Sequence, residues 1–194
     1  MNKLIIALAA IATLACAPKA PLNTWTSEEK ALIEAQDSIM RVLLVTDSKD
    51  STVLRTPCDT LTHEMLLSED YAILARKMLA TVKSPQQGGV GIAGPQVGIS
   101  RRIVAVMRYD KPGKPFELYP NARITAFRGK KESGPEGCLS IPGRRGNVLR
   151  YRDIDITYST PQGDTTESVQ GYSAIIFQHE CDHLDGVLYT DYLD

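Results

Sequence analysis

The chain has 194 residues, which is enough for one domain with a substantial core and too few for two. It carries 22 lysine and arginine residues against 23 aspartate and glutamate residues, and its net charge is −1. The basic residues are scattered and balanced by acids, so nothing indicates a nucleic-acid partner, which requires a concentrated positive surface.

The first residues, 1–16, have the pattern of an export signal. Lys3 gives a positive start, and an apolar run follows from Leu4 to Ala15. This run is shorter than the roughly 20 apolar residues that a spanning helix needs. The residues that end at Cys16 resemble a bacterial lipoprotein box with Cys16 as the lipidated residue, so we expect an extracytoplasmic, membrane-anchored lipoprotein. The alternatives are an ordinary signal peptide, giving a secreted or periplasmic protein, and a cytoplasmic protein whose N-terminus is not a working signal.

The next segment, residues 17–39, is expected to form a tether and a short helix, before a single folded domain in residues 40–194. Thr26 to Glu29 form a capping-box pattern, which predicts that a helix begins there and continues to about Gln36. The run MRVLLV, Met40 to Val45, is rich in strand-forming residues and predicts a β-strand.

The remaining elements favour an α+β fold. Apolar residues recur at helical spacing between Ser68 and Val82, which predicts an amphipathic helix. A last helix is expected from Gly171 to Leu184, ended by Gly186. Between the two helices, strands follow one another without intervening helices, so antiparallel or mixed sheets are expected rather than a doubly wound sheet. The predicted strands are RIVAVM, FELY, ARITAF, NVLRY, DIDITYS and TTESVQ.

The last predicted helix carries the strongest functional signal. His179 and His183 are four residues apart, so their imidazoles lie on one face of the helix and can share a metal ion. Glu180 follows the first histidine, where its carboxylate can reach a metal-bound water, as in the HExxH helices of metal hydrolases. The alternative is the polar face of an ordinary helix, but Ile175 and Ile176 on the same side favour a face turned inward.

A catalytic metal usually has three protein ligands and a water, so one protein ligand is still needed in addition to the two histidines. Only eleven residues follow His183, so the third ligand is expected upstream of the helix. Cys138 is the candidate, because it lies in a glycine-flanked turn within EGCLS, Glu136 to Ser140.

Three motifs together resemble the signature motifs of the peptide deformylase family. They are GVGIAGPQ (Gly89–Gln96), EGCLS (Glu136–Ser140) and QHECDHL (Gln178–Leu184), in the family's order. The resemblance covers roughly Met40 to Asp194 and implies sheets packed around a C-terminal metal-binding helix. It also implies an enzyme that removes the formyl group from N-formylmethionyl peptides or nascent chains. An export signal is unexpected in this family, whose members normally act in the cytoplasm or in organelles.

The resemblance also assigns the chemistry. Cys138, His179 and His183 would hold one divalent ion, Fe²⁺ in the first place, with Zn²⁺, Ni²⁺ or Co²⁺ as alternatives that also suit a thiolate and two imidazoles. Glu180 would take a proton from the attacking water and deliver it to the leaving amine. The backbone N–H of Leu139 and the side chain of Gln96 would stabilise the oxyanion.

Substrate contacts follow from the same resemblance. Val90 and Gly91 would offer backbone groups to an extended peptide. Tyr172 and Ile175 would line a pocket for the methionine side chain, with ordinary core packing as the alternative. We further expect the Glu136 carboxylate to pair with Arg145 and hold the cysteine turn, Cys181 to point away from the metal, and the protein to be a monomer.

Two other functions remain open at this point. One is another metal-dependent amidase or peptidase, whose third ligand would lie downstream of the histidines and would leave EGCLS unexplained. The other is a catalytically silent, membrane-tethered peptide-binding module, which the expected location supports and the presence of Glu180, Gln96 and three ligands opposes. Turnover of formyl-methionyl peptides separates all three.

Overall fold

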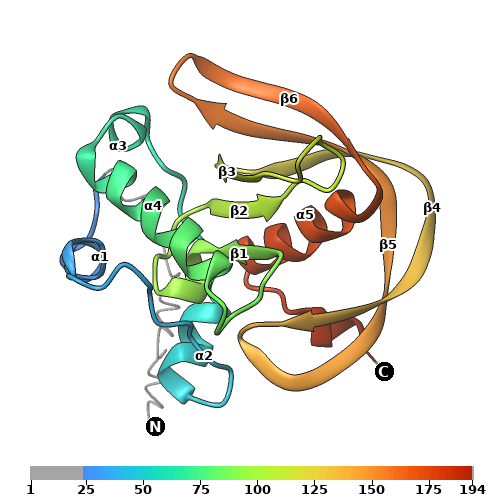
Figure 1. The fold of residues 1–194 in the computed structure, drawn as a ribbon, viewed down its shortest axis with the longest axis horizontal. Helices are drawn as coiled ribbons and strands as arrows, with labels where there is room; N and C mark the ends of the chain where they lie inside the picture. Colours follow the sequence, from blue (N-terminus) through green and yellow to red (C-terminus); the bar gives the residue numbers. More distant parts are fainter. Residues whose placement is uncertain (1–23, 194) are drawn as a thin grey trace, which may run out of the picture.

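The computed structural model describes residues 24–193. Two three-stranded antiparallel sheets surround a central helix, α5 (Gly171–Leu184), which contacts strands of both (Figure 1). The predicted α+β class, with sheets around a C-terminal helix, is therefore confirmed. The expected signal in residues 1–16, with Cys16, and the expected tether in residues 17–23 lie outside the described residues. Within residues 24–193, no helix is both long and apolar enough to cross a bilayer.

Helix α1 (Ser27–Glu34) is the predicted short helix, and its capping box is present. The Thr26 side chain accepts a hydrogen bond from the backbone N–H of Glu29, and the Glu29 carboxylate accepts one from the backbone N–H of Thr26. Trp25 and Ile33 are buried in the same apolar cluster as residues of helix α4 (Glu69–Lys83). Residues 24–39 are therefore part of the folded domain rather than a free tether.

A buried ion pair fastens α1 to the domain. Arg101 is 1% exposed, and its Nε and Nη2 donate to the Glu29 carboxylate at 2.9 and 3.0 Å. Burying one charge without its partner is costly, because the low-dielectric interior replaces water around it. We expect Glu29→Ala to lower the free energy of unfolding by about 3–5 kcal/mol, measured by urea denaturation.

The matched control is Glu28→Ala, since Glu28 is an exposed glutamate in the same helical turn. It should cost well under about 1 kcal/mol. A Glu29→Ala protein as stable as this control would show that the buried pair does not hold α1 in place.

The strand predicted at Met40–Val45 is wrong, because this segment is irregular. Its backbone reaches two different segments instead of one neighbouring strand. The N–H of Leu43 donates to the carbonyl of Gln96 at 2.8 Å, and the N–H of Val45 donates to the carbonyl of Ser140 at 3.0 Å. A ladder with one partner cannot form when successive donors bond to separate partners.

Three helices lie between this segment and the first strand: α2 (Ser48–Leu54), α3 (His63–Leu66) and α4. The predicted amphipathic helix corresponds to α4, whose N-cap is Ser68. The first sheet has the order β1 (Gly91–Ala93), β2 (Ile103–Met107), β3 (Phe116–Pro120). A short 3₁₀ helix, η1 (Gly94–Val97), joins β1 to β2.

The second sheet consists of β4 (Arg123–Cys138), β5 (Ile141–Thr160) and β6 (Gly163–Gln170). The predicted runs NVLRY and DIDITYS are one continuous strand, β5, because no turn residues interrupt its pairing with β4. The β4–β5 hairpin curves around α5 (Figure 1), and register shifts along it accommodate that curvature. Its tight turn, Leu139–Ser140, holds Cys138 at the end of β4.

Helix α5 ends as predicted, with Gly186 just past its last turn. Gly186 has φ of 73°, and a Cβ there would lie 2.5 Å from the carbonyl oxygen of Arg55. A residue with a side chain would be strained in this conformation and would clash with that carbonyl. The chain then forms a second 3₁₀ helix, η2 (Tyr189–Tyr192).

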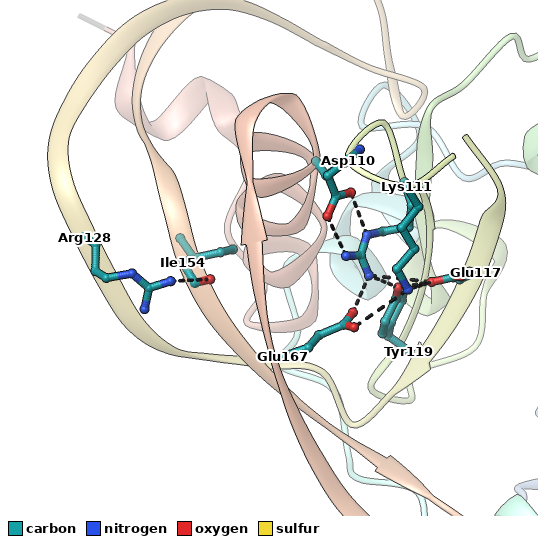
Figure 2. Close-up of polar contacts among 9 residues, drawn as sticks. Asp110, Lys111, Glu117, Tyr119, Arg128, Ile154 and Glu167 are labelled. Atoms are coloured by element: carbon teal, nitrogen blue, oxygen red, sulfur yellow. Dashed lines mark hydrogen bonds and ion pairs between the residues drawn. The ribbon is translucent and has the colours of Figure 1, made fainter. Parts of the chain in front are cut away.

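A charged cluster connects the β2–β3 loop to β6 and to the start of α5. The guanidinium of Arg108 is 2% exposed and pairs with the carboxylates of Asp110 and Glu167. The same guanidinium also contacts the Glu117 carboxylate and the Tyr119 hydroxyl. Figure 2 shows Asp110, Glu117, Tyr119 and Glu167 close together. The backbone N–H of Asp110 donates to the Ser173 hydroxyl at 3.3 Å, so the cluster also positions the first turn of α5.

Candidate metal centre

The structure brings the three predicted ligands together. One donor atom from each of Cys138, His179 and His183 lies within 4.8 Å of the other two. The Sγ of Cys138 and the Nε2 of His183 are 3.2 Å apart. A thiolate and two imidazoles suit a divalent transition metal, and three protein donors leave a fourth position open for water or substrate.

Glu136 sets the orientation of His179. The Nδ1–H of His179 donates to the Glu136 carboxylate at 2.8 Å, so its Nε2 is the nitrogen that a metal would bind. Although burial lowers the pKa of His179, hydrogen bonds to Cys138 and Glu136 raise it to about 10, so a metal would displace a proton from Nε2. Arg150 holds this carboxylate in turn, with its Nε 2.8 Å from Oε1, and it also donates to Asp182 at 2.6 Å. Hydrogen bonds from His179 and Arg150 outweigh burial and keep the pKa of Glu136 below its ordinary value, so the carboxylate is ionised.

The predicted Glu136–Arg145 pair is wrong. Across the β4–β5 ladder, Glu136 lies opposite Gly146, whereas Arg145 lies opposite Gly137. Neighbouring residues of a strand point to opposite faces, so the side chain of Arg145 faces away from that of Glu136. Arg150 is four residues beyond Gly146 and therefore shares the face of Glu136. The alternation within β5 thus selects Arg150 as the partner.

We expect Glu136→Gln to weaken metal binding by about 10–100-fold, because His179 would lose the ionised acceptor that fixes its ring. Competition with a coloured chelator would measure the affinity. Glu132→Gln is the control, since Glu132 is an exposed residue of the same strand whose carboxylate pairs with Arg152 and not with a residue of the centre. Equal affinities of the two variants would contradict the role given to Glu136.

His183 has the protonation state that a metal ligand needs. It is 1% exposed, and this burial lowers its pKa well below the ordinary value. The ring is therefore neutral, and a nitrogen lone pair is available. Its Nδ1 has no hydrogen-bond partner among residues 24–193.

Glu180 is buried beside the three ligands but is not one of them. Its side chain faces β1, where a Cβ on Gly91 would lie 2.3 Å from Oε1 of Glu180. Its other oxygen, Oε2, has no hydrogen-bond partner within the described part of the chain. Burial raises the pKa of Glu180 to about 7. The arrangement places a free carboxylate oxygen next to the centre, and only a glycine at position 91 leaves room for it.

Gln96 also lies at the centre, in η1. Its Oε1 accepts a hydrogen bond from the backbone N–H of Ala93 at 2.8 Å, which fixes the amide orientation. Its Nε2 therefore points to the centre, 3.5 Å from the Sγ of Cys138 and 3.2 Å from the hydroxyl of Ser140. The amide is a positioned donor beside the Cys138 sulfur.

The centre opens into a cavity of about 660 Å³. The four residues predicted to contact substrate all line it: Val90, Gly91, Tyr172 and Ile175. Leu139 lines it as well, and the Tyr172 ring packs edge-on against Tyr109 with centroids 5.1 Å apart. Cys181, as predicted, is buried in the apolar core on another face of α5.

Sequence reasoning did not single out Ser140, Arg150 or Asp182. Ser140 and Asp182 belong to the EGCLS and QHECDHL motifs, so their motif membership was a usable signal. Arg150 is one of several arginines in β5, and only the strand alternation from Gly146 distinguishes it.

Comparison with known proteins gives concordant matches. The family model described as polypeptide deformylase matches residues 41–194. A peptide deformylase of Leptospira biflexa is 35% identical over 149 residues, covering 73% of this chain and 82% of the relative. One of Symbiobacterium thermophilum is 46% identical over 104 residues, covering 53% of this chain and 47% of the relative.

Solved structures agree with these relatives. A class I type b peptide deformylase from Acinetobacter baumannii, solved with Met-Ala-Ser bound, has a TM-score of 0.69 and 33% identity, covering 80% of this chain and 98% of the other. The enzyme from Thermotoga maritima has a TM-score of 0.69 and 31% identity, with the same coverage of 80% and 98%. The residues that the family model matches include the Cys138–His179–His183 centre.

Proposed function

The chain belongs to the peptide deformylase family and has peptide deformylase activity. We propose that its substrates are peptides that begin with N-formylmethionine. The observation that carries the proposal is the three-ligand centre, with Glu180 and Gln96 beside it, next to a cavity large enough for a short peptide. The relative from Acinetobacter baumannii was solved with Met-Ala-Ser, which has the sequence of such a product.

The donor set fits a divalent ion held by Cys138, His179 and His183. We propose Fe²⁺ as the native ion, on the family resemblance, with Zn²⁺, Ni²⁺ and Co²⁺ as the other ions that this donor set accepts. When bound, such an ion supplies Lewis acidity, which polarises the formyl carbonyl and lowers the pKa of a water. Metal analysis of protein purified without oxygen tests the choice of ion.

Residues of the chain transfer the proton of the attacking water and stabilise the negative charge that develops on the formyl oxygen. Glu180 accepts a proton from the water that attacks the formyl carbon, and then gives it to the nitrogen of methionine as the C–N bond breaks. Formate and a free amine leave. The amide of Gln96 and the backbone N–H of Leu139 donate to the oxyanion that develops on the formyl oxygen.

The rest of the substrate is held by the walls of the cavity. The peptide lies extended along the start of β1, where Val90 and Gly91 offer backbone groups and the absence of a side chain at Gly91 permits close approach. The methionine side chain enters beside Ile175 and Tyr172. These contacts orient the formyl group relative to Glu180.

Release of formate from formyl-Met-Ala-Ser tests the proposal, with acetyl-Met-Ala-Ser as the matched substrate that should not react. Formate from the first peptide alone is the expected result. Cleavage of a peptide bond instead would support the peptidase alternative. Binding of the peptide without any product would support the silent module.

We also propose that the protein is a membrane-anchored lipoprotein that faces away from the cytoplasm, on the pattern of residues 1–16. Because the Thr24 carbonyl accepts a hydrogen bond from Arg101 and residues from Trp25 onward pack into the domain, a leader starting at Cys16 would have only residues 17–23 before the fold. Fully extended, those residues span at most about 25 Å, which would keep the domain near the bilayer. Two or three acyl chains on one cysteine anchor a protein stably.

The expected result for Cys16→Ser is a shift from the membrane to the soluble fraction, while the unaltered protein stays with the membrane. Mass spectrometry of the mature N-terminus should find an acylated Cys16 in the unaltered protein alone. Two soluble proteins that begin at the same residue would leave an ordinary signal peptide or a cytoplasmic enzyme as the explanation.

A further inference from the structure

The charges on the cavity wall are unevenly distributed. Its lining includes two acidic side chains, Glu136 and Glu180, and both are buried. Glu136 is paired with Arg150 and His179, so its charge is already compensated. The exposed charges on the lining are the guanidinium groups of Arg144 and Arg145.

These two arginines have no acidic partner among the described residues. Neither forms an ion pair with any residue in the range 24–193, although most other arginines there do. Gln87, Gly88 and Gly89, which also line the cavity, carry no charge. The mouth of the cavity is therefore positive, and nothing within the described chain neutralises it.

The hairpin holds the arginines close to the centre. Arg145 lies opposite Gly137 in the β4–β5 ladder, and a Cβ on Gly137 would be 3.5 Å from its Cγ and 3.9 Å from its Nε. Its side chain therefore lies along Gly137, the residue before Cys138. The backbone carbonyl of Arg144 accepts a hydrogen bond from the Tyr189 hydroxyl at 2.8 Å, which ties this part of β5 to η2.

An extended peptide advances by about 3.3 Å per residue, so the first two residues after a formylmethionine at the centre come within reach of these side chains. Guanidinium groups bind carboxylates in preference to neutral groups, often through two hydrogen bonds. We propose that Arg144 and Arg145 select formylated peptides with a carboxylate one or two residues after the formylmethionine. This inference rests on the proposed deformylation of formyl-methionyl peptides.

Two sources can supply that carboxylate: the C-terminus of a short peptide, or an aspartate or glutamate side chain. The first pair of test substrates is formyl-Met-Ala-Ser with a free C-terminus and with a C-terminal amide. The second pair is formyl-Met-Ala-Asp-amide and formyl-Met-Ala-Asn-amide. For each pair, kcat and KM are measured at low and high salt.

The unaltered enzyme is expected to prefer the charged member by roughly threefold to tenfold in kcat/KM, mostly through KM, because a contact made equally before and during the reaction changes binding alone. The preference should shrink at high salt, which screens exposed charges. Arg144→Gln/Arg145→Gln should lose it while turning over the neutral members as before. Lys49→Gln/Lys130→Gln, which removes two exposed charges outside the cavity lining, should keep it.

A preference for the free C-terminus alone would identify short peptides as the favoured substrates, and a preference in both pairs would identify any nearby carboxylate. Equal kcat/KM within both pairs would overturn the inference and leave deformylation intact. Absence of formate from all four peptides would instead overturn the proposed substrate class.

Discussion

Glu180→Gln is expected to bind metal as the unaltered protein does and to lose roughly 10²–10⁴-fold in kcat. The carboxylate is not a ligand, so its removal leaves the donors of Cys138, His179 and His183 in place. Glutamine has nearly the same shape but cannot take up a proton. Its amide also fits the same space beside Gly91, so the fold should be retained.

Formate release and metal content, measured on the same preparation, separate the two effects. Glu69→Gln removes an exposed carboxylate at the start of α4 and should behave as the unaltered enzyme. Activity of Glu180→Gln within a factor of two of this control would remove Glu180 from the mechanism. Loss of metal would show instead that the carboxylate supports the ligands.

A substitution at Gly91, which packs against Glu180, would also affect this carboxylate. A Cβ at position 91 would lie 2.3 Å from its Oε1 and 2.8 Å from a methyl of Ile176, so Gly91→Ala must displace the carboxylate or β1. This crowding explains the glycine without reference to the substrate. The sequence shows that Gly91 belongs to a motif, but only the structure shows that a side chain at this position would collide with Glu180.

Hydrophobic periodicity and turn residues predict correctly those helices and strands whose local sequence favours one structure only. Helix α4 and the strands β2, β3 and β6 have such signals, and they occur where the patterns indicate. The segment Met40–Val45 has the composition of a strand, but strands need a partner along their length. Its neighbours are the separate Gln96 and Ser140 segments, and that arrangement is a property of the tertiary fold.

Some features of the candidate site can likewise be predicted from local sequence, whereas others depend on how distant segments pair. The spacing of His179 and His183 is a local property of one helix, so the sequence predicts their common face. Cys138 is distant in sequence from the histidines, so only the need for a third ligand upstream of the helix and the three motifs taken together indicate it. The partner of Glu136 depends on the register of β4 against β5. The sequence does not reveal this register, so it cannot distinguish Arg150 from Arg145 as the partner.

The N-terminal segment shows a further limit. Its capping box predicts α1, but nothing local indicates that Glu29 pairs with Arg101, 72 positions later. That pair, together with Trp25, packs residues 24–39 against the domain, whereas the sequence predicts the short helix but places it in a segment outside the folded domain. Long-range charge pairing of this kind depends on which segments the fold brings together.

Cys138→Ala is the other substitution with a large expected effect. It removes the thiolate donor and leaves two imidazoles, so we expect metal affinity to fall by more than the 10–100-fold that loss of a supporting residue costs. Deformylase activity should be lost with the metal. Because Cys138 is partly exposed at the end of β4, the change from sulfur to methyl should affect the free energy of unfolding little.

Cys181→Ala is the matched control, since this second cysteine of the region is buried in the apolar core and is not part of the donor cluster. After dialysis against a weak chelator, the control should retain its metal and the Cys138 variant should not, while circular dichroism reports on folding in both. Full occupancy in Cys138→Ala would exclude the thiolate as a ligand. The HExxH histidines would then need a third donor elsewhere, as in the peptidase alternative, and the geometry that joins β4 to α5 would need another explanation.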